Sequence, residues 1–187
     1  MSIAGCTTPN QDPQNEEIPL RMSFIADTLD RVEDRDVKFN MKNELTNSPV
    51  LILWIAAGCS GCHDWTELIR NSLNNGSLNS STVSVISIHR WSNIESNEQV
   101  MEVFGTEDNN SFYTPWPIIM PSETDFLIDF ETDEETSFSI YEGYGNPGTP
   151  TVQLIGQDGI KMWQSKSYRA NHTLLEQAWD IGQKISN

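Results

Sequence analysis

The hydrophobic positions of the chain predict a buried strand followed by an amphipathic helix near its middle. Residues 50–55 form a continuous apolar run after Pro49, which is typical of a strand buried on both faces. Beyond residue 62, apolar side chains recur at helical spacing, and residues 74–76 (Asn-Asn-Gly) supply a stop signal. The sequence Cys59-Ser60-Gly61-Cys62 therefore lies where a buried strand turns into a helix.

Other strands and helices are predicted on both sides of this unit. Residues 83–88 alternate and are rich in β-branched side chains, and residues 95–104 suit a helix. Strand, helix, strand and helix at these spacings indicate a parallel strand pair joined by a crossover. Three weaker patterns remain. Residues 20–29 suit either a short helix or a strand, and the alternating residues 37–41 suit an edge strand. Residues 116–120, which are bracketed by prolines, suit a short edge strand.

The last quarter of the chain predicts a hairpin and a helix. Pro150 opens a strand over residues 152–155, and Asp158-Gly159 is a strong turn signal before a second strand over residues 160–163. Asn171 is placed to cap a final amphipathic helix.

The composition is acidic, which argues against binding partners that are themselves negatively charged. The 187 residues contain 27 Asp and Glu against 11 Lys and Arg, giving a net charge of −16. Binding to nucleic acid or anionic lipid through charge is therefore not expected, and no run of 18 apolar residues predicts a membrane span. Residues 122–142 hold eight acidic residues and no basic ones, so they form either a solvated surface with one buried side or a docking surface for a basic partner.

The N-terminal residues are predicted to be a tether. Ile3-Ala4-Gly5-Cys6 resembles a bacterial lipobox, in which the cysteine is lipidated, although no charged region and no full apolar region precede it. The following residues are polar and proline-containing. We expect a disordered tether over residues 1–19, a folded domain over residues 20–187, and membrane contact only through a lipid on Cys6. The alternative is a free cysteine in a flexible tail.

The two cysteines at the start of the central helix are predicted to be redox-active. Unpaired amides and the helix dipole stabilise a thiolate there. Such settings in CxxC motifs lower a cysteine pKa from about 8.5 to between about 3.5 and 7.5. Two intervening residues let Cys62 reach Cys59 across one turn, so we expect Cys59 to attack and Cys62 to resolve.

Three other interpretations of the CxxC motif stay open. A zinc site needs four ligands, and only the widely spaced His63, His89 and His172 are available, so no metal is expected. Cys59 to His63 also matches the CxxCH attachment motif of c-type haem, with Met120 as a conceivable axial ligand, although a buried strand running into the motif does not suit small helical haem domains. The third is a binding module with a structural or inert CxxC.

The order of these features resembles the thioredoxin fold over residues 37–185. The carrying features are a buried strand leading into CxxC, a long intervening segment, the sequence Gly148-Thr149-Pro150-Thr151, a hairpin and a C-terminal helix. The chain looks most like the extracytoplasmic TlpA/ResA-like group of thiol-disulfide oxidoreductases. The resemblance implies an α/β fold with a central mixed β-sheet flanked by helices and an inserted segment between the βαβ and ββα halves.

The resemblance also assigns roles to residues. Cys59 matches an exposed nucleophilic cysteine, Cys62 a buried resolving one, and Pro150 a cis-proline that faces the disulfide. The Thr149 backbone would then pair with an incoming substrate chain. Residues placed around the cysteines complete the expected substrate-binding surface: Gly58, Ser60 and Gly61.

The chain departs from the family pattern at two positions. Gly58 stands where a tryptophan usually precedes the first cysteine, and Leu53 where thioredoxin has a buried acid, so Cys62 needs another base. His63 is either a residue that stabilises a thiolate when protonated or a plain surface residue.

The implied function is extracytoplasmic thiol-disulfide exchange with protein thiols and disulfides. It needs no cofactor beyond the Cys59–Cys62 disulfide, but it does need a redox partner that the sequence does not identify. The direction of exchange is left open, and the resemblance favours a reductant in cytochrome c maturation or disulfide repair.

Overall fold

Two β-sheets organise the structure, a computed structural model that describes residues 17–107 and 111–185. The first sheet has five strands in the order β5 (Ile118–Ile119), β4 (Ser84–His89), β3 (Val50–Ile55), β8 (Thr151–Ile155) and β9 (Lys161–Ser165). The second has four, in the order β2 (Lys38–Asn40), β1 (Met22–Asp27), β6 (Phe126–Asp129) and β7 (Glu135–Ser139). The α-helices are α1 (Met41–Leu45), α2 (Ser60–Asn74), α3 (Asn97–Val100), α4 (Ile140–Gly143) and α5 (His172–Ile185), and two further short helical segments are η1 (Val32–Asp34) and η2 (Met101–Gly105).

The five-stranded sheet is mixed, as predicted. Strand β3 pairs with β4 in parallel, from Val50 opposite Ser84 to Ile55 opposite His89. On its other side β3 pairs antiparallel with β8, and β8 with β9. The predicted parallel pair and the C-terminal hairpin are therefore confirmed, and β3 and β4 end at the same edge of the sheet.

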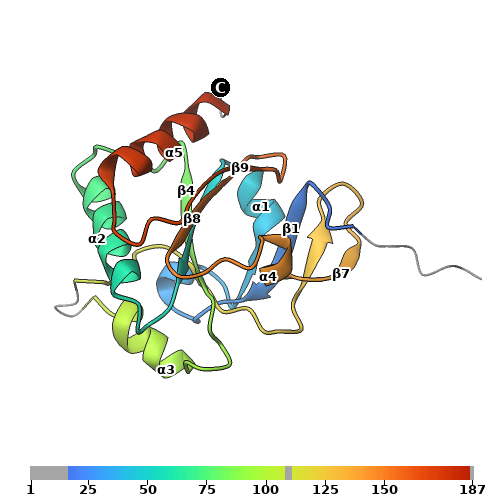
Figure 1. The fold of residues 1–187 in the computed structure, drawn as a ribbon, viewed down its shortest axis with the longest axis horizontal. Coiled ribbons are helices and arrows are strands. Elements are labelled where there is room, and N and C mark those ends of the chain that lie inside the picture. The colour runs from blue at the N-terminus through green and yellow to red at the C-terminus, as the bar shows by residue number, and fades with distance from the viewer. Residues whose placement is uncertain (1–16, 108–110, 186–187) are drawn as a thin grey trace, which may run out of the picture.

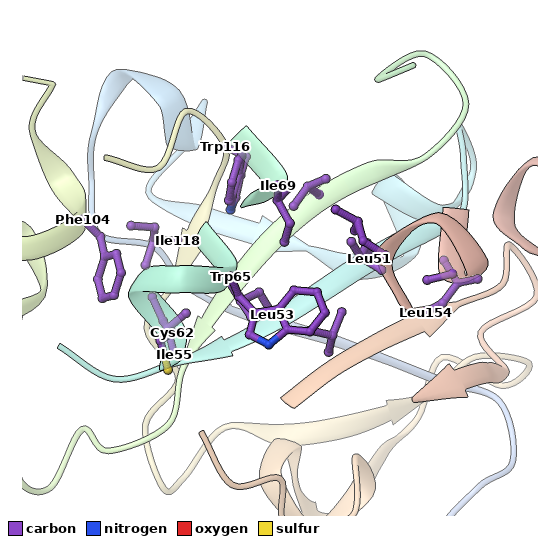
Figure 2. Close-up of a cluster of buried hydrophobic side chains, with 14 of the residues drawn as sticks. Leu51, Leu53, Ile55, Cys62, Trp65, Ile69, Phe104, Trp116, Ile118 and Leu154 are labelled. Carbon is purple, nitrogen blue, oxygen red and sulfur yellow. The ribbon is translucent and has the colours of Figure 1, made fainter. Parts of the chain in front are cut away.

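The alternating side chains of β3 belong to two separate cores. Leu51, Leu53 and Ile55 pack in a cluster with residues of α2 and α5. The other three side chains of β3 pack with residues of α1, α4 and the second sheet. Figure 1 shows these two layers on opposite sides of the central strands, and Figure 2 shows the first cluster. Because both faces of β3 are covered, all six of its residues are buried, which explains the continuous apolar run.

The second sheet was not predicted as a sheet, although the alternating run over residues 37–41 contains its edge strand β2, as expected. Residues 20–29, which suited a helix or a strand, contain strand β1, and β1 pairs with β2 on one side and β6 on the other. Strands β6 and β7 come from the acidic segment 122–142. Leu127 in β6 is fully buried, as the expected buried side of that segment requires. The segment is therefore a structural part of the domain.

A buried ion pair joins the N-terminal region to the central sheet. Arg31 Nη2 donates to Asp34 Oδ1 at 2.7 Å, and the two side chains are 4% and 0% exposed. Arg31 also donates to the carbonyls of Thr114 and Trp116, while Asp34 accepts from the amide of Ile118 in β5. Each charge is thus satisfied by several partners, as burial of charged groups requires.

The predicted tether and Cys6 fall largely or wholly outside the described residues, so both stay predictions. In the part of the chain that the structure describes, no helix has the length and apolar character needed to cross a membrane.

Replacing Asp34 with asparagine is expected to lower the free energy of unfolding by roughly 3–5 kcal/mol, because Arg31 would be left as a buried charge without an anion. The midpoint of urea unfolding measures this effect. Asp27→Asn removes a carboxylate from an exposed pair with Lys38 and is the matched control, expected to leave the midpoint nearly unchanged. Equal midpoints for Asp34→Asn and the unmutated protein would contradict a stabilising role.

Candidate active site

The two cysteines of the CxxC motif are joined by a disulfide at the start of α2. Strand β3 ends at Ile55, and after a short turn Cys59 is the N-cap of the helix, with extended backbone angles. The Cα atoms of Cys59 and Cys62 are 5.2 Å apart. The amide of Cys62 donates to Cys59 Sγ at 3.1 Å. A helix-terminal amide therefore points at the first sulfur, which is the arrangement that favours negative charge there.

The two sulfurs differ in their access to solvent. Cys59 is nearly buried, at 9% exposed, and is therefore not the exposed cysteine that the resemblance implied, whereas Cys62 is fully buried. Both cysteines belong to the same apolar cluster as Ile55 and Trp65, and Figure 2 shows the Cys62 sulfur at one end of that cluster. Of the two cysteines, Cys59 alone therefore keeps some exposed surface.

The Thr149–Pro150 segment lies against the CxxC motif. The peptide bond between the two residues is cis, as predicted. A Cβ atom built on Gly61 would lie 3.1 Å from Pro150 Cδ, so the proline packs directly on the second residue of α2. The indole of Trp91 donates to Thr149 Oγ1 at 3.2 Å, which ties this segment to the loop after β4.

The loop between β9 and α5 also contributes to the site, which the sequence pattern did not reveal. The hydroxyls of Ser60 and Tyr168 are hydrogen-bonded at 2.8 Å, and the indole of Trp65 donates to the carbonyl of Ser167. Tyr168 is 50% exposed beside the motif. Tyr168 lies more than 100 residues from the cysteines along the chain, so no local sequence pattern places it at this site.

His63 is a partly buried residue rather than a plain surface residue. Its Nε2 lies 2.8 Å from the carbonyl of Ala57, which only a protonated nitrogen can satisfy, so Nε2–H donates. The ring stacks on Phe112 at a centroid distance of 4.2 Å and meets the edge of Phe104. This geometry does not suit the haem alternative, because Nε2 is already bonded and both cysteine sulfurs are joined to each other.

Glu95 is a further residue at the site that no sequence motif indicated. Its carboxylate accepts hydrogen bonds from the amides of Ala57 and Gly58, at 2.6 and 2.9 Å, and lies 3.0 Å from His89 Nε2. Burial works to raise the pKa of Glu95, but the hydrogen bonds outweigh it and the pKa is lowered. Burial lowers the pKa of His89 in spite of the nearby carboxylate. Glu95 is therefore an anion that holds the turn before Cys59.

The two departures from the family pattern are visible in the structure. Gly58 is exposed, and Leu53 is fully buried in the cluster that contains Cys62. In the described residues, no group of three His, Cys, Asp or Glu side chains is placed to hold a metal ion.

Comparison with solved structures identifies the fold. The chain is similar to the thioredoxin domain of a thiol-disulfide oxidoreductase from Bacteroides vulgatus (15% identity, TM-score 0.54, 91% of this chain and 97% of that one). It is also similar to a thiol-disulfide isomerase from Corynebacterium glutamicum (15% identity, TM-score 0.57, 91% and 97%) and to an exposed lipoprotein thioredoxin from Streptococcus pneumoniae (14% identity, TM-score 0.54, 85% and 98%). No protein-family profile and no curated protein matches the sequence.

The protein therefore has the α/β thioredoxin fold that its sequence predicted. Within this fold it carries a CxxC disulfide at the start of α2 and a cis-proline next to it.

Replacing Gly61 with alanine is expected to destabilise the protein, because the new Cβ would collide with the backbone carbonyl of Tyr168 and press on Pro150. Overpacking costs about 1–3 kcal/mol, which exceeds the gain of about 1 kcal/mol that alanine brings to a helix interior. Urea unfolding measures the difference. Gly148→Ala, where a Cβ meets nothing within 4 Å, is the control and should not be destabilised. A more stable Gly61→Ala variant would show that the loop is not packed on the motif.

Proposed function

We propose that the protein is a thiol-disulfide oxidoreductase that exchanges electrons with other proteins through Cys59 and Cys62. The observation that carries the proposal is the disulfide itself: it joins a helix N-cap cysteine that keeps a small exposed surface to a fully buried cysteine, and a cis-proline lies beside it. A purely structural disulfide needs neither the asymmetry in access nor the adjoining proline loop.

The exchange proceeds in two displacements. In the reducing direction, the Cys59 thiolate attacks one sulfur of a substrate disulfide, and the other substrate sulfur leaves as a thiolate and takes a proton. The Cys62 thiol loses its proton and attacks Cys59 Sγ, which closes the Cys59–Cys62 disulfide and releases the second substrate thiol. The substrate gains two electrons from the protein and two protons, one from the Cys62 thiol and one from the solvent, which took up the Cys59 proton when the thiolate formed. The reverse sequence oxidises a dithiol.

The substrate is expected to be an extended protein segment. Strand β8 begins to pair with β3 at Thr151, opposite Trp54, so the Thr149 backbone lies just before the ladder. An extended chain can add to such a segment through backbone hydrogen bonds. The surface that would receive it is formed by Gly58, Ser60, Gly61, Thr149 and Pro150, and Tyr168 adds an exposed aromatic ring at its border.

His63 is proposed to modulate the reaction from within the helix. It follows Cys62 directly, and its hydrogen bond to Ala57 fixes the ring next to the turn that carries Cys59. In the protonated form the imidazolium would favour the thiolate.

The proposed location is outside the cytoplasm, with residues 1–19 as a tether and a lipid on Cys6 as the membrane attachment. The lipobox-like sequence supports this, as does the similarity to a lipoprotein thioredoxin exposed on Streptococcus pneumoniae. A separate redox partner would restore the cysteine pair after each exchange.

Cys59→Ser is expected to abolish the reduction of insulin disulfides by dithiothreitol-recharged protein, because no other thiol of the motif is reachable.

Cys62→Ser keeps the attacking thiol but cannot release the substrate, so a mixed disulfide between Cys59 and insulin should accumulate on non-reducing gels and in intact-mass spectra.

The controls separate the competing functions. If the unmutated protein and Cys59→Ser have the same activity, and Cys62→Ser captures no substrate, the disulfide is structural and the protein is a binding module. A Soret band in protein produced with the haem-attachment machinery would favour the haem interpretation instead.

A further inference from the structure

The turn that carries Cys59 is held by a carboxylate from a different part of the chain. Glu95 bridges the amides of Ala57 and Gly58, which directly precede Cys59. Strands β3 and β4 are parallel, so their carboxyl ends meet at one edge of the sheet, with Ile55 opposite His89. Glu95 belongs to the loop that follows β4, and this loop is folded back by hydrogen bonds from the amides of Ile94 and Glu95 to the carbonyl of Trp91.

His89 fixes the position of this carboxylate. The His89 side chain is fully buried, and its Nε2 lies 3.0 Å from Glu95 Oε2. Its Nδ1 is also buried and has no hydrogen-bond partner among the described residues. A protonated Nδ1 would leave a buried donor unpaired, which is costly, so the ring is neutral and donates one hydrogen bond through Nε2. The negative charge of Glu95 is therefore oriented by His89 but not cancelled by it.

The other charged and titratable groups around the turn do not neutralise Glu95 either. The Asp64 carboxylate of α2 pairs with Arg169 at 3.3 Å, and both are exposed. The Arg90 guanidinium lies over the rings of Trp91 and Tyr141. No lysine or arginine among residues 17–107 and 111–185 forms a salt bridge with Glu95 within 4 Å. Three uncharged titratable groups also lie near the turn: His63 donates to the carbonyl of Ala57, Tyr168 is hydrogen-bonded to Ser60, and the Tyr141 hydroxyl donates to the carbonyls of Pro121 and His89.

This arrangement opposes the usual effect of a helix N-terminus on a cysteine. The amide of Cys62 and the dipole of α2 favour a negative charge on Cys59 Sγ. The Glu95 anion, bonded to the two preceding amides, disfavours a second negative charge nearby and also occupies those amides. We infer that Glu95, held by His89, is a positioning residue that fixes the turn before Cys59 and disfavours the Cys59 thiolate, so that the cysteine pair gives up electrons more readily than it would without this carboxylate.

The inference rests on the proposed function and adds a direction to it. Whatever destabilises the thiolate destabilises the reduced protein relative to the disulfide, so removal of the Glu95 charge should make the pair a weaker reductant. The effect on this equilibrium should appear only at pH values at which Cys59 is ionised. A change in loop packing alone would alter the equilibrium at every pH.

The test compares Glu95→Gln with unmutated protein. The pKa of Cys59, measured as the pH dependence of iodoacetamide alkylation of the reduced protein, is expected to fall by about one unit, the lower end of the range for a nearby charge. Above both pKa values, the equilibrium constant for oxidation by glutathione disulfide should fall about tenfold, equal to about 30 mV for two electrons. At a pH well below both pKa values, the two proteins should have the same constant.

Two further variants control for charge and for packing. Glu98→Gln removes the same charge from an exposed residue of the same segment and should leave the Cys59 pKa unchanged. Glu95→Asp keeps the charge with a shorter reach and should retain a pKa close to that of the unmutated protein. A fall in Glu95→Asp as large as in Glu95→Gln would assign the effect to loop geometry and overturn the inference, as would an unchanged or raised pKa in Glu95→Gln.

If Glu95→Gln does not fold, the Cys59 pKa of the unmutated protein tests the inference instead. Its Cys59 pKa is expected above about 7.5, the upper end of the range for cysteines activated in CxxC motifs, and a lower value would overturn the inference. Failure of the proposed function would give a different result in the alkylation experiment. If dithiothreitol cannot reduce the disulfide in the folded protein, no alkylated Cys59 would form at all.

Discussion

The parallel pairing of β3 with β4 is the constraint on which the site depends. It brings the carboxyl ends of the two strands to the same edge of the sheet, where Ile55 lies opposite His89. The antiparallel partner β8 begins at that edge as well, with Thr151 opposite Trp54. The CxxC motif, the Glu95 loop and the cis-proline therefore converge because three neighbouring strands begin or end together, although they are distant in sequence.

The register of those strands is held by packing and by one buried polar group. Trp54 Nε1 donates to Gln153 Oε1 at 2.8 Å inside the core, and the Gln153 amide donates to the carbonyl of Tyr144 and to Gln164. A buried amide is stable only when its hydrogen bonds are made. A shift of β8 against β3 by one residue would break this network and turn the apolar side chains to the wrong faces. The network thus fixes where Pro150 lies relative to the cysteines.

The parts of the fold that were predictable are those with a local signal. Continuous burial marked β3, helical spacing marked α2 and α5, and the Asp158-Gly159 turn marked the hairpin. In the second sheet only β2 had such a signal, the alternation over residues 37–41, whereas β1 and β6 lie about 100 residues apart and pair only in the folded chain. The acidic segment was recognisable as half-buried, but its partner strand was not.

The residues of the candidate site also fall into those that a local motif predicted and those that only the structure shows. Cys59, Cys62 and Pro150 were found because each belongs to a short motif, and the cis bond at Pro150 agrees with the resemblance. Glu95 and Tyr168 were missed because single polar residues in loops have no periodicity. The sequence allows two roles for His63, and only the structure shows its hydrogen bond to Ala57 and its stacking on Phe112.

The measurement that tests the central claim most directly is a redox titration of the folded, unmutated protein. The protein is equilibrated in glutathione buffers of graded potential, quenched with acid, and its thiols are counted by mass after alkylation. The account predicts one reversible transition in which Cys59 and Cys62 gain or lose two electrons together, with the same midpoint from either direction. A pair that stays oxidised at every potential while the fold is intact would contradict the account.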